Sequence, residues 1–383
     1  MINKSIKQNN SSTFFILAGE QSADNYGAIL IRSLKKIKPN AKFTGIGGKN
    51  MKEAGLNSIE NINKLSVMGF VEIIKHLFFF VALTDRVLKE IKLVKPLQII
   101  LIDYPGFNLR LAKKIKARFN IPITYYISPK LWAWKENRIE IIRECIDQML
   151  VIFPFEESWY KERGIHVKFV GHPVFDDWAP TPRRNLCNSL GLNLNMPIIT
   201  LFPGSRKQEL NQHLLLFIRV AEKLRYKNPK LQFILGLAHE MNLDSFSIPD
   251  WINIEKDYPL KALECADVAL VSSGTATLEA AVFGTPMIII YKMDLLTWWL
   301  AKLFVKTDYA GIVNIIAEKK IIPEYLQNQA TAQSIAKEAF EMINNSDRLK
   351  NMRSKLRSVR QKLQGSGASQ KAAQHILSLT QSK

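Results

Sequence analysis

The chain has few cysteines, few acidic residues and no long apolar run. Its 383 residues contain three cysteines, Cys145, Cys187 and Cys265, which lie far apart and form no Cys/His cluster. This spacing predicts neither a disulfide framework nor a zinc site, and it fits a reducing compartment. The apolar runs at residues 77–83 and 295–301 fall well short of the ~20 residues that a membrane-spanning helix needs. We therefore expect a chain that does not cross a membrane.

Residues 1–12 lack the apolar segment of a signal peptide, because they are polar and lead directly into a strand-like run. This favours a cytoplasmic protein. The shortage of acidic residues, 34 Asp and Glu against 53 Lys and Arg, leaves a formal net charge of +19. Such a charge favours a polyanionic partner, which is a nucleic acid, a nucleotide or an anionic lipid. Nucleic acid is the least favoured, because the chain has no RNP motif and no stacking aromatics at alternating strand positions.

A hydrophobic content of 47% over this length supports a full core and predicts two α/β domains. Residues 268–291 have the pattern of a strand, a turn, a helix and a second strand of a parallel sheet. In the turn, Gly274 allows close approach of a ligand, and the Thr275 and Thr277 hydroxyls lie at a helix start that attracts phosphate. One turn into the helix, the Glu279 carboxylate is suited to accepting hydrogen bonds from the two hydroxyls of a ribose. The alternative is a capped turn without a ligand.

Two further strand ends in the N-terminal half carry carboxylates. The apolar run at 13–18 leads to the segment with Glu20, Ser22 and Asp24, and the run at 97–102 leads directly to Asp103. In open α/β sheets, ligands and catalytic groups gather at these carboxyl ends. Asp103 is therefore the candidate general base, with Glu20, Ser22 and Asp24 as further catalytic candidates. Helix capping is the alternative for each carboxylate.

Aromatic and basic residues alternate at 129–135, with Arg138 and Arg143 on the next helix. They fit either a stacked ligand with a phosphate, or a packing cluster with a solvated basic face. Residues 176–195 are rich in Pro, Asn and Arg, and we expect the interdomain linker there. Beyond it, Arg206 follows a Gly-Ser turn and is suited to a phosphate group.

Two apolar patches point to a lipid. A helical pattern within 65–95 places one set of residues on a single face, while Phe78, Phe79 and Leu83 lie off it; the set is Leu77, Phe80, Val81, Thr84, Val87, Leu88 and Ile91. The second patch, at 295–305, has Trp298 and Trp299 beside lysines. Both patterns are typical of a membrane-contacting surface or an acyl-chain groove. Deep burial of the first helix and ordinary core packing of the tryptophans are the alternatives.

Taken together, the motifs resemble the lipid-A-disaccharide synthases, which are inverting glycosyltransferases of the GT-B type. The resemblance covers nearly the whole chain. It is specific because nine short motifs occur in the same order as in the family. They are GEQSAD at 19–24, GIGGKNMKEAG at 45–55, LSVMGFVEII at 65–74, IDYPGFN at 102–108, SPKLWAWKENR at 128–138, FVGHPVFD at 169–176, FPGSRKQEL at 202–210, SSGTATLEAAVFGTPM at 272–287 and VKTDYAGIVN at 305–314.

The resemblance implies a GT-B fold, in which two doubly wound, Rossmann-like domains face each other across a cleft. Residues 1–178 would form the acceptor and membrane-associated domain, completed by a C-terminal helix at 360–383, and residues 190–359 the UDP-sugar domain. Asp103 would deprotonate the acceptor 6-hydroxyl. Contacts with acyl chains or with the membrane would be made by Phe78, Phe79, Phe80, Trp298 and Trp299. The donor would be bound by Arg206, Ser205, Ser273, Gly274, Thr275, Thr277, Glu279 and Asn314.

The same resemblance implies the substrates and the setting. UDP-2,3-diacylglucosamine and 2,3-diacylglucosamine 1-phosphate (lipid X) would give a β-1′,6-linked disaccharide 1-phosphate and UDP, with no metal or other cofactor. The enzyme would lie peripherally on the anionic inner membrane, and the family's domain-swapped dimers allow a homodimer. The chain departs from the family pattern at Ala23 and Gly106. A related GT-B transferase, a UDP-sugar epimerase and a catalytically degenerate lipid-binding protein are the competing interpretations.

Overall fold

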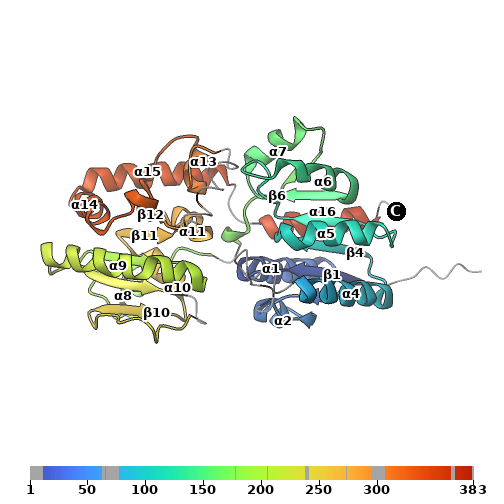
Figure 1. The fold of residues 1–383 in the computed structure, drawn as a ribbon, viewed down its shortest axis with the longest axis horizontal. Helices are drawn as coiled ribbons and strands as arrows, with labels where there is room; N and C mark the ends of the chain where they lie inside the picture. The colour runs from blue at the N-terminus through green and yellow to red at the C-terminus, as the bar shows by residue number, and fades with distance from the viewer. Residues whose placement is uncertain are drawn as a thin grey trace, which may run out of the picture. The chain divides into compact units, whose positions relative to one another are not determined.

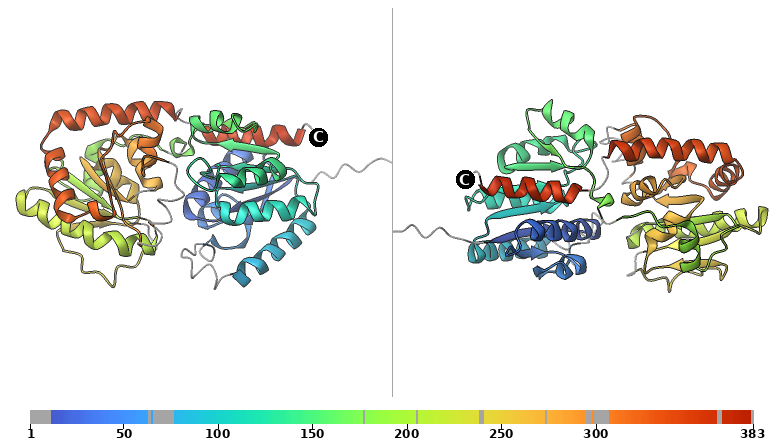
Figure 2. Two further views of the ribbon diagram at one scale, coloured as in Figure 1. Left: turned by 45° about the horizontal axis from the view of Figure 1, so that its top comes forward. Right: turned by 180° about the vertical axis from the view of Figure 1, so that it is seen from behind.

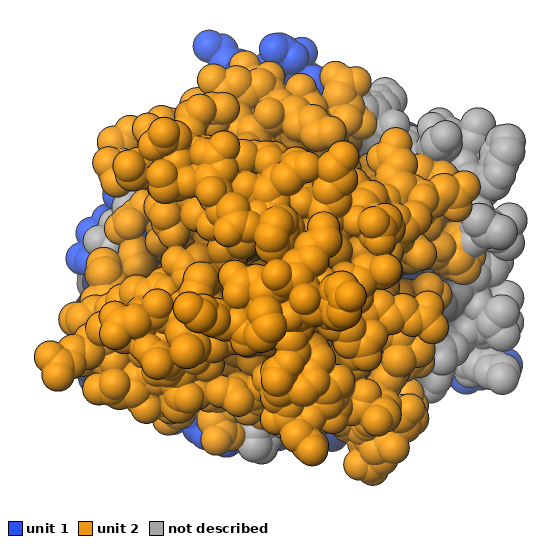
Figure 3. All heavy atoms as spheres, turned by 90° about the vertical axis from the view of Figure 1, so that its left-hand side faces the viewer, with its two compact units in different colours: residues 1–177, 365–383 blue, residues 178–364 orange. Residues whose placement is uncertain are grey.

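The chain forms two compact units, each built on its own parallel sheet. The computed structural model describes residues 12–62, 65, 77–176, 178–204, 206–237, 241–272, 274–294, 298, 307–363 and 367–381. Unit 1 comprises residues 1–177 and 365–383, and unit 2 comprises residues 178–364 (Figures 1 and 3). The expected linker at 176–195 is wrong in its second half. Residues Arg183–Ser189 form helix α8, whose Leu186 and Cys187 are buried in unit 2.

Unit 1 contains a seven-stranded parallel sheet in the order β3-β2-β1-β4-β5-β6-β7. The inner strands β1, β4 and β5 are almost wholly buried, as expected for apolar strands with helices on both faces (Figure 1). The strand order reverses between β1 and β4, which both pair in parallel. The strands are β1 (Thr13–Ala18), β2 (Lys42–Ile46), β3 (Leu56–Glu60), β4 (Gln98–Ile102), β5 (Ile123–Tyr126), β6 (Gln148–Val151) and β7 (Lys168–Phe169).

The helices of unit 1 form two groups. One group contains α4, α5 and α6, and the other contains α1, α2 and α16. The helices are α1 (Gln21–Ile37), α2 (Lys49–Glu53), α4 (Leu77–Val94), α5 (Pro105–Lys116), α6 (Ile139–Cys145), α7 (Pro154–Lys161) and α16 (Ala368–Gln381), with short 3-10 turns η2 (Glu136–Arg138) and η3 (Pro173–Phe175).

Unit 2 contains a six-stranded parallel sheet in the order β10-β9-β8-β11-β12-β13, which reverses between β8 and β11. Its strands are β8 (Ile198–Phe202), β9 (Gln232–Gly236), β10 (Ile252–Glu255), β11 (Val268–Ser272), β12 (Met287–Tyr291) and β13 (Glu324–Leu326). Its other helices are α9 (Lys207–Lys227), α10 (Pro259–Cys265), α11 (Thr275–Phe283), α13 (Ile312–Ala317), α14 (Ala332–Ile343), α15 (Ser346–Lys362) and the 3-10 turn η4 (Gln327–Gln329).

The helical tail divides between the two units. The sequence pattern predicts a helical tail over 331–382, and the resemblance assigns its last part, 360–383, to the first domain. In the structure α14 and α15 belong to unit 2 and α16 returns to unit 1. The Asp176 carboxylate accepts hydrogen bonds from the backbone N–H groups at the start of α16, those of Gly367 (2.6 Å), Ala368 (3.0 Å) and Ser369 (2.6 Å). From there α16 packs along α1 (Figure 2). Asp176 therefore fixes the point at which the chain re-enters unit 1.

Helix α4 buries most of the face that its sequence predicts, including Val87, Leu88 and Ile91, and differs from it at two positions. Leu83 is 3% exposed although the pattern places it off the buried face, whereas Val81 is 49% exposed. Phe80 packs partly buried against the core, with Thr84 donating its hydroxyl to the Phe80 carbonyl at 2.7 Å. Of the predicted helix, residues 66–76 lie outside the described part of the chain. Among the helices of the described residues, none is long and apolar enough to cross a membrane.

Candidate active site

In unit 1, the carboxyl ends of β1 and β4 are in direct contact at the point where the strand order reverses. The Tyr104 ring lies so close to Gly19 that a Cβ atom at this position would collide with the ring carbons. The Tyr104 hydroxyl donates to the Leu65 carbonyl at 2.7 Å. The turn before Glu20 and the turn after Asp103 are thus packed together at the sheet edge where open α/β proteins bind ligands.

The backbone around Asp103 is strained and held from several sides. Asp103 and Tyr104 both have left-handed φ values, 45° and 51°, which are costly for residues with a side chain. The Asp103 carbonyl accepts hydrogen bonds from the Tyr125 hydroxyl (2.6 Å) and the Asn108 amide (2.7 Å). Because Tyr125 and Asn108 are buried, these bonds keep the half-buried Asp103 in one backbone conformation. The Asp103 carboxylate therefore projects from a fixed point on this edge, which suits a general base.

The three candidates of the first motif have different surroundings. Glu20 lies at the N-cap position of α1, and its carboxylate accepts from the Ser22 hydroxyl at 2.7 Å. Asp24 is fully buried, and its two oxygens accept from the backbone N–H groups of Gly48 (2.6 Å), Asn50 (3.0 Å) and Met51 (3.2 Å). Asp24 therefore holds the start of α2, and its carboxylate is not available to contact a substrate. Ala23, 1% exposed, fits into α1.

The sequence analysis missed a buried acid at the same edge, Glu156 at the start of α7. Its side chain is 1% exposed and accepts from the Trp132 indole N–H (3.2 Å) and the Phe153 backbone N–H (3.1 Å). Burial raises the pKa of Glu156 to about 7 against the lowering effect of these hydrogen bonds. Trp132 also packs edge-on against Phe155. The capping pattern at residues 153–156 was a signal for this contact, but the partner Trp132 lies 24 residues away.

In unit 2, the loop after β8 presents Arg206, which lies at the N-cap position of α9 and pairs with Glu209 at 3.5 Å. Behind it, His213 is buried and spans two strand ends, with Nδ1 3.1 Å from the Pro203 carbonyl and Nε2 accepting the Lys292 N–H at 2.9 Å. These contacts require a neutral ring that carries its proton on Nδ1. Burial lowers the pKa of His213, which favours that neutral form. His213 therefore ties the Arg206 loop to the end of β12.

The start of α11 matches the predicted turn in part. Gly274 is the N-cap residue, and a Cβ atom built on it would meet no other atom within 4 Å, so a ligand has room to approach the backbone. Thr275 is exposed. Thr277 is fully buried and donates its hydroxyl to the Gly274 carbonyl at 2.7 Å, so it stabilises the first turn and does not face a ligand. Ser205 and Ser273 lie outside the described residues.

Glu279 has an unusual electrostatic environment. Burial alone raises its pKa to about 7. Within the described part of the chain, its carboxyl group forms no ion pair that would oppose this rise. A buried carboxyl group without a charged partner gains most from hydrogen-bond donors supplied by a ligand, such as ribose hydroxyls.

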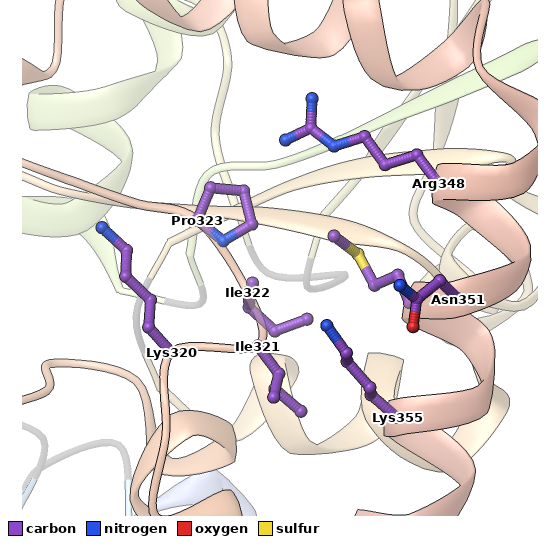
Figure 4. Close-up of a pocket in the computed structure, with 8 residues that line it drawn as sticks. Lys320, Ile321, Ile322, Pro323, Arg348, Asn351 and Lys355 are labelled. Atoms are coloured by element: carbon purple, nitrogen blue, oxygen red, sulfur yellow. The ribbon is translucent and has the colours of Figure 1, made fainter.

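Asn314 does not fit its expected role in donor binding. It is fully buried, its amide donates to the Ile322 carbonyl (2.9 Å) and Glu324 (2.7 Å), and its oxygen accepts from the Ile321 and Ile322 N–H groups. All of its polar atoms are therefore used to hold β13 against α13. The segment that it holds borders a surface hollow of about 280 Å³ at the amino end of β13, ringed by the cations Lys320, Arg348 and Lys355 (Figure 4).

Of the predicted lipid-contacting residues, Phe78 is 86% exposed, whereas Phe79 and Phe80 pack partly against the core. Trp298 is half-buried and Trp299 lies outside the described residues. In the part of the chain that the structure describes, no group of three or more His, Cys, Asp or Glu is arranged to hold a metal ion. The predicted independence of metal and other cofactors stays a prediction.

Comparison with known proteins connects both units to one family. A family model described as lipid-A-disaccharide synthetase matches residues 14–377. Lipid-A-disaccharide synthase 1 of Legionella pneumophila is 39% identical over 365 residues, which cover 94% of this chain and 95% of that protein. Lipid-A-disaccharide synthase of Coxiella burnetii is 38% identical over 375 residues, covering 96% and 99%.

Solved structures identify the fold. The calicheamicin glycosyltransferase superposes with a TM-score of 0.60 at 14% identity and covers 96% of this chain and 97% of its own. The S. aureus MnaA structure with UDP superposes with a TM-score of 0.66 at 13% identity, covering 96% of both chains. With its two parallel-sheet α/β units, the chain has the GT-B fold, and by the extent of its sequence similarity it belongs to the lipid-A-disaccharide synthase family of glycosyltransferases.

Proposed function

We propose that this enzyme transfers 2,3-diacylglucosamine from UDP-2,3-diacylglucosamine to the 6-hydroxyl of 2,3-diacylglucosamine 1-phosphate. The products are the β-1′,6-linked disaccharide 1-phosphate and UDP. The observation that carries this proposal is the match to lipid-A-disaccharide synthases over nearly the entire chain, 39% identical across 94% of it. The candidate residues at the carboxyl ends of both sheets supply groups of the right chemistry.

Asp103 acts as the general base in this reaction. Its carboxylate removes the proton from the acceptor 6-hydroxyl while that oxygen forms a bond to the donor anomeric carbon. The bond from this carbon to the UDP oxygen breaks, and UDP leaves with the bonding electron pair. Attack from the face opposite to UDP inverts the α-linked donor. The strained backbone at residues 103 and 104, held by Tyr125 and Asn108, supports this role because it fixes the position from which the carboxylate projects. Glu20, paired with Ser22, orients the acceptor.

Unit 2 binds the donor. The Arg206 guanidinium and the free N–H groups at the start of α11 stabilise the diphosphate as negative charge develops on the leaving group. Gly274 and Thr275 lie at that helix start, and Glu279 accepts hydrogen bonds from the ribose. This arrangement needs no metal ion, because fixed dipoles and a guanidinium provide the charge stabilisation.

We further infer that the enzyme acts at the cytoplasmic surface of the inner membrane. The formal charge of +19 favours anionic lipid, and the exposed Phe78 offers apolar contact at the start of α4. The half-buried Trp298 of unit 2 is the second aromatic residue that we assign to membrane contact. A homodimer is compatible with this proposal.

Transfer by the purified full-length chain in detergent, with EDTA, tests the proposal. We expect disaccharide from the wild type and a rate loss of about 10²–10⁴ in Asp103→Asn, the range for removal of a general base. Asp85→Asn, on the exposed face of α4, removes the same charge and is the matched control. Binding of UDP without disaccharide formation would point to a different acceptor, and epimerised UDP-sugar would point to the other GT-B chemistry.

A further inference from the structure

The end of β5 holds both backbone polar groups of Asp103. The Asp103 N–H donates to the Tyr126 carbonyl at 3.0 Å, and the Asp103 carbonyl accepts from the Tyr125 hydroxyl at 2.6 Å. Tyr125 and Tyr126 are the last two residues of β5, and both are fully buried. The conformation of the residue that carries the candidate base therefore depends on where the end of β5 lies.

The residue directly after β5 is itself in a strained conformation. Ile127 has a left-handed φ of 67°, which is a genuine outlier for a β-branched side chain, and it is buried. Asp103 and Tyr104 have the same kind of φ at the end of the neighbouring strand β4. Strained backbone of this kind persists only where the surrounding contacts fix it. Contacts from outside the turn are therefore needed to hold Ile127.

Helix α7 makes such contacts with the segment that follows β5. The Tyr160 hydroxyl lies 2.8 Å from the Ser128 hydroxyl oxygen, and both residues are buried. One turn earlier in α7, Glu156 accepts from the Trp132 indole N–H at 3.2 Å through Oε1 and from the Phe153 backbone N–H at 3.1 Å through Oε2. Helix α7 therefore holds this segment at two points.

We propose that Glu156 is a positioning residue for Asp103, an inference that rests on the proposed function, in which Asp103 is the general base. The Glu156 carboxylate fixes the segment after β5, and the end of β5 fixes the backbone of Asp103. Loss of the Glu156 contacts moves the point from which the Asp103 carboxylate projects, whereas the donor-binding residues of unit 2 are untouched. A catalytic group that is misplaced by about 1 Å can lower the rate about 10²-fold. Glu156 is therefore expected to act on kcat and little on KM.

The ionised form of Glu156 is the one that accepts both hydrogen bonds. Protonation turns one of its oxygens into a donor that faces the N–H of Trp132 or Phe153. Burial raises the pKa of Glu156 to about 7, against the lowering effect of these two bonds. The nearby titratable groups keep their charge in this range, because burial raises the pKa of Tyr160 and lowers the pKa of His172, which packs against Phe153, to about 3. A transition of this network near pH 7 therefore reports on Glu156.

The test is Glu156→Gln, whose side chain carries one accepting oxygen and one donating nitrogen and so resembles protonated Glu156 at every pH. We measure kcat for disaccharide formation in detergent from about pH 5.5 to about pH 8.5, a range that brackets the transition, with saturating donor so that titration of Glu279 does not enter. The variant's kcat should lie about 10–10²-fold below the wild-type value at the upper end and converge with it below about pH 6. KM for each substrate should stay within about twofold of the wild-type value at the same pH.

Glu338→Gln on α14 is the matched control. The Glu338 carboxylate also accepts from two side chains, the Tyr325 hydroxyl at 3.2 Å and the Arg348 guanidinium, but it lies in unit 2. Its kcat should equal that of the wild type at each pH. Tyr160→Phe is a milder variant of the network, since it removes only the hydroxyl that contacts Ser128. It should lower kcat in the same direction, whereas Tyr325→Phe should not.

Hydrogen exchange separates this inference from the proposed function. The amides of residues 103–108 and 127–132 are followed without substrate in the wild type and in each variant. Faster exchange of both segments in Glu156→Gln and Tyr160→Phe, and not in the two controls, supports the positioning role even if no transfer is detected. Acceleration confined to 127–132 overturns it, because Asp103 is then independent of the segment after β5. An unchanged kcat in Glu156→Gln, or a loss by the same factor at every pH, also overturns it and leaves the proposed function intact.

Discussion

Replacing Asp176 should release helix α16 from unit 1. The Asp176 carboxylate accepts three backbone N–H groups at the start of this helix, Oδ1 from Gly367 and Ala368 and Oδ2 from Ser369. In Asp176→Ala these N–H groups lose their acceptor, and the helix loses a negative charge at its positive end. An N-cap replacement costs about 0.5–2 kcal/mol, and hydrogen bonds to a charged group contribute about 1.5–3 kcal/mol each.

Because the three bonds share one carboxylate, these values do not add, and we expect a loss of about 2–4 kcal/mol in the free energy that holds α16. Asp176→Asn keeps the Oδ1 acceptor but loses the charge and the bond to Ser369, so about 1–2 kcal/mol is expected. Hydrogen exchange of the α16 amides measures this directly, since exchange from a locally opened helix accelerates about tenfold for each 1.4 kcal/mol lost.

The matched control is Asn345→Ala, which removes the cap of α15 in unit 2, where the Asn345 side chain accepts from the Arg348 N–H at 2.9 Å. It should accelerate exchange at the start of α15 and leave α16 unchanged. Unaltered exchange of α16 in Asp176→Ala would show that its buried Ala372, Ala373 and Ile376 hold the helix without the cap, and would refute the reasoning.

Three further outcomes are expected. Gly19→Ala places a methyl group against the Tyr104 ring, so transfer should fall at least tenfold with a lower melting temperature; unchanged values in both measurements would contradict the close packing. Burial raises the pKa of Glu279 to about 7, and hydrogen bonds from the ribose favour its charged form. The calorimetric affinity for UDP-N-acetylglucosamine should therefore rise as pH increases through about 7. Glu279→Gln should remove this dependence of affinity on pH. His213→Phe loses the hydrogen bonds to Pro203 and Lys292, so KM for the donor should rise several-fold while KM for the acceptor stays constant; equal changes in both would argue against a local effect.

The sequence pattern predicts the inner strands well because they are continuous apolar runs. It misses β3, β10 and β13, which carry polar residues. Edge strands of a parallel sheet are buried less fully, so their composition resembles that of loops. In α4, Val81 and Leu83 are exchanged between faces, since a helix start that is apolar most of the way round does not define its own orientation.

The candidate site shows a similar limit. Glu20, Asp103, Arg206 and Gly274 could be located from the sequence because each lies in the loop that follows a strand. Asp24 and Asn314 also lie in recognisable motifs, yet their polar atoms are used by backbone groups at the start of α2 and, for Asn314, by the backbone of residues 321 and 322 and the Glu324 carboxylate. These hydrogen bonds join residues of different segments, and a local sequence pattern does not predict such contacts.

The same limit hides Glu156. Its carboxylate accepts from Trp132, which lies 24 residues away in the sequence. Tertiary contacts of this kind decide whether a polar side chain in a motif faces a ligand or supports the fold.

The return of α16 to unit 1 also constrains the order in which the chain folds during synthesis. Residues 178–364 of unit 2 are contiguous, so they can complete their sheet as soon as they leave the ribosome. Unit 1 begins to emerge first but lacks α16 until all of unit 2 has been translated. Until then the surface of α1 that α16 covers is open and Asp176 has no helix to cap. During this interval the nascent first unit lacks the apolar side chains of Ala372, Ala373 and Ile376, which are buried once α16 packs on α1.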